Sequence, residues 1–246
     1  MQENTKEGYA LKVRVKFAKE GAMKFIGHLD IMRYFQKAVK RAGLDVAFSE
    51  GFSPHMIMSF ASPLGVGITS TGEYFDMELK SAASSSDMVK RLNDAMAEGM
   101  KILSIRQVED GKASKAMSLV AAADYRLKFR ETAKLPENWK EKLEEFKVQK
   151  EIVILKKTKK SEKELDIRPF IYELSLEEND KIFMQLAAGS SNNTKPELVM
   201  EAFAAFMEIP YEDLKFMIHR CELYADTGSD EARNLISLED LGEEIE

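Results

Sequence analysis

The sequence is short of cysteine, and this limits the kinds of site it can contain. Cys221 is the one cysteine among 246 residues, so an internal disulfide is excluded. A zinc or iron–sulfur centre built from cysteine thiolates is excluded for the same reason. A long apolar run is lacking too, because the longest, around 119–123, is far below the roughly 20 residues of a membrane-spanning helix. Residues 1–7 lack the apolar core of a secretory signal, so we expect a cytoplasmic protein that does not bind membranes.

The chain has no overall excess of basic charge, and its acidic residues are distributed unevenly. Residues 226–246 hold eight acidic residues against one basic residue, Arg233, so this segment accounts for the whole net charge of −6. A segment so acidic and without aromatic residues is predicted to be a mobile tail, with at most one short helix near 235–241. The remaining body is close to neutral. That balance neither supports nor excludes nucleic-acid binding, because a local patch matters more than the total charge.

The first half of the chain alternates between strand and helix patterns. Leu11, Val13, Val15 and Phe17 alternate with basic residues, as in a half-buried strand, and an apolar stripe from 29 to 42 predicts a helix that Gly43 ends. Further strands are predicted at 45–49, 56–60, 73–79 and 100–108, with a second helix at 86–98. This β-α-β-β-α-β order is typical of the split βαβ, or ferredoxin-like, arrangement.

The same order recurs in the second half. Strands are predicted at 125–129, 151–156, 170–176, 181–187 and 214–224, with helices at 137–146 and 195–207. We therefore predict an α+β fold made of a tandem of two ferredoxin-like domains, each an antiparallel sheet with helices on one face. The predicted division is a first domain at 1–110, a linker at 111–123, a second domain at 124–225 and the acidic tail at 226–246.

Unusual residues are densest between 25 and 76, where two of the three histidines lie at element boundaries. His28, Asp30, Glu50 and His55 are candidate catalytic residues, because a histidine paired with a carboxylate suits acid–base chemistry near neutral pH. Each also has a structural interpretation: Asp30 suits the N-terminus of a helix, and His55 could close a loop by local hydrogen bonds. No spacing matches a known metal or triad signature, so we predict no metal site.

Other residues are candidates for binding a ligand or a partner. Arg33, Ser49 and Ser53 lie in the same stretch as the histidines, at boundary positions where a scaffold presents functional side chains. Asp166 and Arg168 stand out in the segment LDIRP, although a structural Asp–Arg bridge is the simpler interpretation. On the last predicted strand Arg220 could face a cleft between the halves, with the side chain of the preceding histidine on the opposite face.

A basic face on the first helix could contact phosphates. Arg33, Lys37, Lys40 and Arg41 lie opposite its apolar stripe, and the alternative is an ordinary solvated face. A second basic run, at 156–160, has the same two interpretations. The open face of the first sheet looks different, because its basic residues are expected beside Tyr74, Asp76 and Glu78 of a neighbouring strand. With few aromatic residues, that face does not look like an RNA-stacking sheet.

Four motifs in this order carry a resemblance to a known family. The segments KFIGHLDIMR (24–33), EGFSPH (50–55), PLGVG (63–67) and LDIRP (165–169) resemble the bacterial radical SAM-linked protein family, a domain of unknown function. The resemblance covers residues 9–225, and Met56 departs from it because a proline is expected there. It implies a partner, because members occur beside or fused to cobalamin-binding radical SAM proteins, frequently near RNA-processing and ribosomal genes.

Three functions remain open at this point. The resemblance favours a non-catalytic accessory module that docks a radical SAM/cobalamin-binding protein and helps to present a substrate, RNA among the candidates. The chain cannot itself be a radical SAM enzyme, since the cluster needs three cysteine thiolates, and we expect no cofactor of its own. The alternatives are an independent RNA-binding or RNA-processing protein, and a small-molecule enzyme that uses the candidate catalytic residues. The sequence leaves open the substrate, the partner surface, the oligomeric state and whether the two histidines meet.

Overall fold

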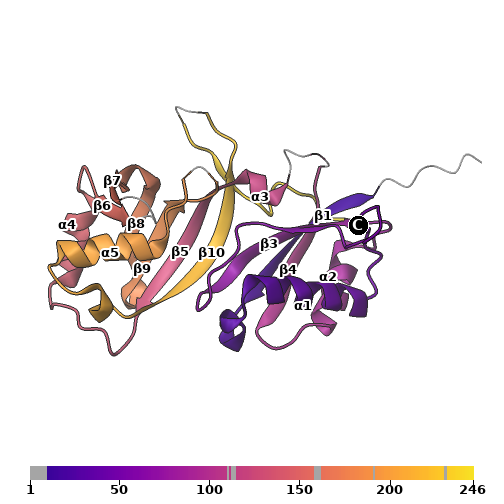
Figure 1. Ribbon diagram of the computed structural model, residues 1–246, viewed down its shortest axis with the longest axis horizontal. Coiled ribbons are helices and arrows are strands. Elements are labelled where there is room, and N and C mark those ends of the chain that lie inside the picture. The colour runs from indigo at the N-terminus through magenta and orange to yellow at the C-terminus, as the bar shows by residue number, and fades with distance from the viewer. Residues whose placement is uncertain (1–9, 110, 112–114, 158–161, 191, 230–231) are drawn as a thin grey trace, which may run out of the picture.

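The computed structural model describes residues 10–109, 111, 115–157, 162–190, 192–229 and 232–246. Parts of the predicted linker, of the basic run 156–160 and of the tail lie outside these residues. In the described part of the chain, nine strands form one sheet with helices packed on it, which is a mixed α+β fold. The strands pair antiparallel except where the two halves meet. The molecule is elongated, with the two halves side by side along its long axis (Figure 1).

The first half follows the predicted element order. Its elements are β1 (Leu11–Lys19), α1 (His28–Arg41), β2 (Met58–Phe60), β3 (Thr69–Leu79), α2 (Ser85–Asp94) and β4 (Met100–Gln107). The strands lie in the order β4-β1-β3, and β2 pairs with the other side of β3. Every second residue of β1, such as Val15 and Phe17, points into a core that α1 and α2 close with Phe35 and Leu92. The strand predicted at 45–49 is reduced to isolated bridges at Val46 and Phe48.

The second half also has the predicted order, with additions. Its elements are α3 (Ala116–Leu119), β5 (Val120–Phe129), α4 (Trp139–Lys147), β6 (Val153–Lys157), β7 (Glu162–Asp166), β8 (Ile171–Glu177), β9 (Lys181–Ala187), α5 (Pro196–Phe206), β10 (Phe216–Asp226) and β11 (Leu235–Ser237). The strand order is β10-β5-β9-β8, and α4 and α5 pack on it through Phe146 and Phe203. β6 and β7 form a separate two-stranded hairpin. α3 and the first residues of β5 lie within the range predicted as the linker, 111–123.

The two halves share one continuous sheet. β10 runs parallel to β3, with His219 opposite Thr69 and Arg220 opposite Ser70. The backbones approach closely here, since a Cβ on Gly72 would lie 2.5 Å from the Cα of Glu222, so only glycine fits at this position. The ferredoxin-like assignment of each half and the domain boundaries stay predictions.

The acidic tail differs from its prediction. Residues 232–246 do not extend freely: β11 pairs with β10, Leu238 is fully buried, and Glu243 pairs with Gln107 next to β4. The prediction of a mobile tail considers only the composition of the segment and not its contacts with the rest of the fold. In the fold, the carboxylate of Glu239 lies 2.7 Å from the Lys16 ammonium group on β1, so the basic open face of the first sheet fixes the acidic segment.

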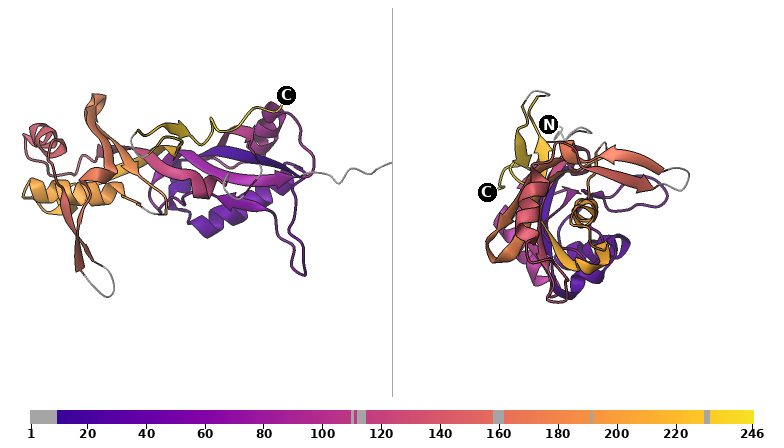
Figure 2. Two further views of the ribbon diagram at one scale, coloured as in Figure 1. Left: turned by 90° about the horizontal axis from the view of Figure 1, so that it is seen from above. Right: turned by 90° about the vertical axis from the view of Figure 1, so that its left-hand side faces the viewer.

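Two segments project from the same side of the molecule. The loop between α1 and β2 and the β6–β7 hairpin both extend away from the sheet in the two views of Figure 2. They come from opposite halves of the chain and lie far apart along its long axis. None of the helices in the described residues is long and apolar enough to cross a membrane.

Candidate functional site

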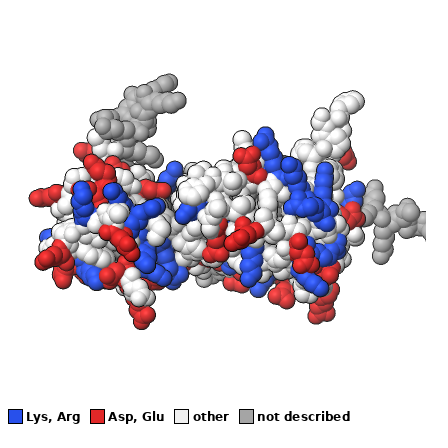
Figure 3. Space-filling view, turned by 90° about the horizontal axis from the view of Figure 1, so that it is seen from below, with Lys and Arg blue, Asp and Glu red and all other residues white. Residues whose placement is uncertain are grey.

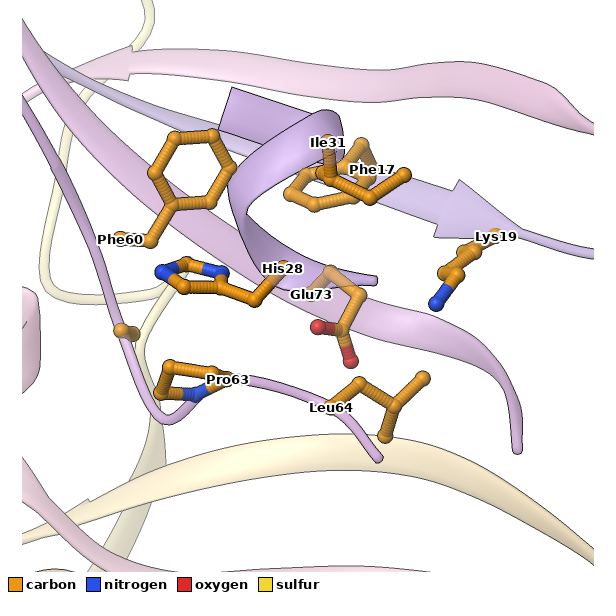
Figure 4. A pocket seen from close by; sticks show the side chains of 9 residues that line it. Phe17, Lys19, His28, Ile31, Phe60, Pro63, Leu64 and Glu73 are labelled. Carbon is orange, nitrogen blue, oxygen red and sulfur yellow. The ribbon is translucent and has the colours of Figure 1, made fainter. Parts of the chain in front are cut away.

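A small pocket opens at the start of α1, where the ends of several elements meet. Its walls come from β1, α1, β3, the end of β2 and the loop that follows it. They consist of Phe17, Lys19, His28, Ile31, Phe60, Ala61, Pro63, Leu64 and Glu73. Figure 4 shows the imidazole ring of His28 between Phe60 and Pro63, with the carboxylate of Glu73 pointing toward the loop. Three ionisable side chains therefore border a space with aromatic and aliphatic walls.

Lys19 reaches this pocket because of its position on β1. It follows Phe17 at the core-facing spacing of the strand, so its side chain enters the apolar side and is only 2% exposed. Its Nζ donates a hydrogen bond to the carbonyl oxygen of Ile26 at 2.8 Å. Burial lowers the pKa of Lys19, because desolvation disfavours the charged ammonium, and the nearby guanidinium of Arg220 adds to this.

Glu73 connects the pocket to the second half of the molecule. It precedes Phe75 at the core-facing spacing of β3 and is 5% exposed. Its Oε1 accepts hydrogen bonds from Nε and Nη2 of Arg220, at 2.9 and 2.6 Å. The same Nη2 donates to the carbonyl oxygen of Ser62 at 2.7 Å, which holds the pocket loop. Arg220 therefore lies buried at the junction, and it fixes both a side chain and a wall of the pocket.

His28 is the predicted catalytic residue that lines this pocket. It is the first residue of α1. The residue before it, Gly27, occupies the N-cap position and has no side chain to form a capping hydrogen bond. The imidazole ring is half-buried and meets the ring of Phe60 edge to face, with 5.5 Å between ring centroids. Among the described residues, none hydrogen-bonds its ring nitrogens, which leaves them available to a ligand.

The other three candidate catalytic residues do not line the pocket. Asp30 is exposed on α1 and pairs with Arg33 at 3.2 Å. His55 closes its own loop, because its Nδ1 lies 2.8 Å from the hydroxyl of Ser49. Glu50 is exposed in the same loop, as is the candidate ligand residue Ser53. The four residues that the enzyme alternative groups together therefore do not line one pocket.

The candidates of the LDIRP segment are engaged with backbone. Oδ1 of Asp166 accepts hydrogen bonds from the backbone N–H groups of Ile152 and Arg168, both at 2.9 Å. The guanidinium of Arg168 donates to the carbonyl oxygens of Gln149 and Ile171, at 3.1 and 2.9 Å. These bonds fix the base of the β6–β7 hairpin to the sheet. Asp166 and Arg168 therefore have a structural role through bonds to the backbone, and their side chains do not form the Asp–Arg bridge that the sequence suggested.

The basic face of α1 is exposed, as predicted. Lys37 and Lys40 point to solvent, and neither forms an ion pair with any residue that the structure describes. Arg41 donates to the carbonyl oxygen of Ala95 at 2.8 Å. Figure 3 shows Lys and Arg side chains gathered on this part of the first half, beside the projecting loop.

Large apolar side chains are exposed on segments that adjoin the pocket residues in the sequence. Phe25 is 65%, Leu29 67% and Val66 63% exposed. Their segments adjoin, because the backbone N–H of Gly67 donates to the carbonyl oxygen of Lys24 at 2.8 Å. We call Phe25, Leu29 and Val66 the apolar rim. Phe52, at the end of the projecting loop, is fully exposed as well.

Within the described residues, no three histidine, cysteine or acidic side chains are grouped closely enough to hold a metal ion. Sequence reasoning found His28 and Arg220 but missed Lys19 and Glu73. The sequence does contain a signal for both: each is a charged residue at a position where the alternation of its strand predicts an apolar one.

Comparison with family models gives a clear match. Residues 12–196, about three quarters of the chain, match the model of a family described as an uncharacterized protein conserved in bacteria, DUF2344. The chain belongs to this family. The matched region contains α1, the pocket residues of β1 and β3, and the β6–β7 hairpin of this DUF2344 protein. It ends before β10, so Arg220 and the C-terminal segment lie outside it.

Other comparisons give weaker likenesses. No curated protein matches the DUF2344 chain. Among solved structures, a Cbf5-Nop10-Gar1 complex is 11% identical with a TM-score of 0.41, covering 86% of this chain and 48% of the other. A chain of an archaeal box H/ACA sRNP Nop10-Cbf5 complex is 13% identical with a TM-score of 0.40, covering 95% and 53%. An unknown protein from Galdieria sulphuraria is 13% identical with a TM-score of 0.24, covering 86% and 98%. The chain spans about half the length of the first two.

Proposed function

We propose that this DUF2344 protein is a non-catalytic accessory subunit that docks a larger partner through the apolar rim. The observation that carries the proposal is the exposure of Phe25, Leu29 and Val66 on adjoining segments at one end of α1. Large apolar side chains exposed together, with charged residues around them, are typical of protein–protein contact sites. Charged neighbours such as Lys24, Asp30 and Arg33 supply that polar border.

The partner that we propose is a cobalamin-binding radical SAM protein. The support is the resemblance of the four motifs to the radical SAM-linked family, together with the single cysteine, which leaves any cluster chemistry to another chain. Two of those motifs, KFIGHLDIMR and PLGVG, contribute the three rim residues. The proposal includes the ferredoxin-like character of each half, supported by the strand order β10-β5-β9-β8, and a cytoplasmic location.

A binding experiment with the purified proteins tests this function. The full chain is mixed with the radical SAM protein of the same organism, after nuclease treatment, and the affinity is measured by calorimetry. The double variant Phe25→Ser/Leu29→Gln should weaken binding at least tenfold. Val148→Ser is the matched control, since Val148 is 71% exposed but lies in the second half. Absence of binding by the native chain, or equal affinity of the double variant and the native chain, would contradict the proposal.

RNA binding is a second candidate function, favoured by two lysines of α1 that form no ion pair with any described residue. Lys37 and Lys40 lie on one exposed helix face and could contact successive phosphates. Binding to a single-stranded RNA should weaken with salt, and Lys37→Gln/Lys40→Gln should reduce the slope of log affinity against log salt by about 0.7 per lysine. Lys90→Gln/Lys101→Gln makes the same charge change elsewhere and should leave the slope unchanged. An unchanged slope in the first variant would remove this candidate.

A further inference from the structure

β8 is the last strand of the sheet, and one of its two edges carries no further strand. In the order β10-β5-β9-β8 it pairs with β9 alone among the described residues. It lies beside α4, at the end of the molecule away from the first half (Figure 1). At its start the guanidinium of Arg168 donates to the carbonyl oxygen of Ile171 at 2.9 Å. The outward N–H and C=O groups of the residues that follow, 172–177, are a template for a second extended backbone, and we call these residues the open edge.

A cavity extends along the start of the open edge. Its volume is about 280 Å³, whereas roughly 15 Å³ is enough for one water molecule. Residues 171–174 of β8 all line it, and consecutive side chains of a strand point to opposite faces, so the cavity follows the edge rather than one face. The opposite wall comes from the end of α4 and the segment before β6. We call it the edge cavity, and its lining residues are Lys147, Val148, Ile152, Arg168, Ile171, Tyr172, Glu173 and Leu174.

One side of the edge cavity is apolar and reaches solvent. Ile152, Ile171 and Leu174 are buried parts of its lining, and Val148, which also lines it, is 71% exposed. The buried part lies on the face of the sheet that α4 covers, since Leu174 belongs to the same core as Phe146. An apolar side chain inserted beside Val148 would remove apolar surface from water, which favours binding.

The other face of the open edge is acidic. By the alternation of the strand, Glu173 and Glu177 point to the face opposite Leu174. Glu177 accepts two hydrogen bonds from the guanidinium of Arg126, at 2.7 and 2.9 Å. Glu173 is exposed and accepts a hydrogen bond from the hydroxyl of Ser175 at 3.1 Å, and no described cation forms an ion pair with it. β8 contains no basic residue, so the charge along its edge is negative.

These charges select the kind of strand that fits the open edge. Opposite charges across a strand pair attract, so a basic side chain is favoured opposite Glu173. A second copy of β8 would place its own glutamates along the edge, where like charges repel. A strand that alternates basic and apolar side chains suits both faces, because the basic ones lie beside Glu173 and the apolar ones enter the edge cavity.

We propose that the open edge of β8 binds an extended peptide whose side chains alternate between basic and apolar. The peptide backbone continues the sheet, its apolar side chains pack against Val148 in the edge cavity, and its basic side chains lie beside Glu173. Main-chain hydrogen bonds supply affinity in this mode of recognition, and the alternating side chains supply specificity. The apolar rim and α1 take no part, so the inference goes beyond the docking proposed above and does not rest on it.

Three synthetic peptides of equal length test the proposal. One alternates lysine with valine, the second glutamate with valine, and the third lysine with serine. Each is titrated into the full chain labelled with ¹⁵N, and the NMR signals and hydrogen exchange of the backbone amides of 172–177 are followed. The lysine–valine peptide should give saturable shifts and slow the exchange of these amides, and the other two should bind at least tenfold more weakly.

Four other results would overturn the proposal. Equal or tighter binding of the glutamate–valine peptide would show that Glu173 does not select the ligand. Equal binding of the lysine–serine peptide would make the edge a charged surface without an apolar site. Shifts of the same amides that depend on protein concentration, without any peptide, would mean that a second copy of the chain occupies the edge. No saturable shift with any peptide would mean that the edge binds no strand of this kind.

Two variants locate the binding on β8. Glu173→Lys reverses the charge of the edge, so it should bind the lysine–valine peptide at least tenfold more weakly and the glutamate–valine peptide more tightly than the native chain does. Glu98→Lys makes the same change at an exposed position of the first half and should bind both as the native chain does. If Glu173→Lys does not fold, judged by its NMR spectrum, Val148→Ser serves instead and should weaken lysine–valine binding at least threefold. Native affinity in the folded edge variant would overturn the proposal. Failure of the docking through the apolar rim would not change these results.

Discussion

Two groups of buried or partly buried charges lie on opposite faces of the same strands, and they differ in how many of their polar atoms have partners. The sealed cluster consists of Arg14, Lys16, Asp76, Glu222 and Glu239, on the face that the C-terminal segment covers. The pocket cluster consists of Lys19, Glu73 and Arg220, on the face that α1 covers. Every strand residue points to one face or the other, so neighbouring residues of β1 and β3 contribute to both.

The sealed cluster is saturated with partners. Asp76 accepts hydrogen bonds from Nε of Arg14 at 2.9 Å and from the backbone N–H of Ala116 at 2.8 Å. Lys16 contacts both Glu222 and Glu239, at 2.6 and 2.7 Å. In the pocket cluster, by contrast, one oxygen of Glu73 accepts no hydrogen bond from any described residue. The comparison separates charges that hold distant segments together from a carboxylate that keeps one oxygen at the border of a small pocket.

The largest effect should follow from breaking the sealed cluster at its centre. Asp76→Asn removes the negative charge that Arg14 and Lys12 share inside the fold. The free energy of unfolding should fall by about 3 to 5 kcal/mol, measured by urea denaturation. Asp180→Asn breaks an exposed pair with Lys140 and should cost no more than about 0.5 kcal/mol. Equal losses in the two variants would contradict the distinction.

The covering segment should also matter for stability. Leu238 is fully buried, although it belongs to a segment that composition alone predicts to be mobile. Leu238→Ala should lower the free energy of unfolding by about 2 to 4 kcal/mol, because it leaves a cavity under the segment. Leu29→Ala, at an exposed position of α1, is the matched control and should change it by less than about 0.5 kcal/mol. An unchanged free energy of unfolding in Leu238→Ala would mean that the C-terminal segment is not part of the folded unit.

Alkaline pH should affect the two lysines in opposite directions. Burial alone would lower the pKa of Lys16, but its hydrogen bonds to Glu222 and Glu239 hold it above its ordinary value of 10.5. Its contribution to stability is therefore full below 10.5 and is lost as pH rises through the higher pKa of the folded state. The pKa of Lys19 is lowered by burial, so the unfolded chain binds more protons as pH approaches 10.5, and the cost of burying this lysine decreases.

The measurement is the free energy of unfolding of the native chain and of Lys16→Met and Lys19→Met between pH 8 and pH 11, where each unit of pKa difference corresponds to about 1.4 kcal/mol. The advantage of the native chain over Lys16→Met should shrink above pH 10.5. Any advantage of Lys19→Met over the native chain should shrink as pH rises toward that value. Parallel curves for all three proteins would show that neither lysine has a shifted pKa.

The smallest effect is expected from a side chain of the pocket itself. His28→Leu keeps an apolar contact with Phe60 and removes ring nitrogens that no described residue bonds, so the free energy of unfolding should change by less than about 0.5 kcal/mol. Tyr74→Phe removes a hydroxyl that donates to Glu222 at 2.5 Å in the sealed cluster, and should cost about 1 to 2 kcal/mol. A larger loss in His28→Leu than in Tyr74→Phe would reverse the comparison.

The sequence predicts the elements well wherever periodicity decides the structure. The alternation of β1 and the stripe of α1 identify the first core, and the expected placement of Arg14 beside Asp76 is confirmed by the register. The periodicity of a segment does not predict its contacts with distant segments. That Glu239 would meet Lys16, or Arg220 would reach Glu73, depends on how β10 docks beside β3. Local patterns cannot show this.

The candidate site was therefore only partly predictable. His28 stood out because a histidine next to glycine at a helix start is unusual, and it does line the pocket. Lys19 and Glu73 are ordinary charged residues until their strand positions show that they point to the apolar face. A β-bulge between Arg220 and Glu222 lets two residues of one strand join different clusters, which the alternation rule does not anticipate.

The most direct test of the account compares two identical substitutions three positions apart on β1. Lys16→Met and Lys19→Met both replace an ammonium group with a thioether, at a partly buried and at a buried position, and their unfolding free energies at pH 7 are measured by urea denaturation. Lys16→Met leaves Glu222 and Glu239 without their cation and should lose about 3 kcal/mol. Lys19→Met removes an ammonium group with a single hydrogen bond, and its stability should equal or exceed that of the native chain. A loss in Lys19→Met as large as in Lys16→Met would show that the two clusters contribute equally to the fold and would contradict the account.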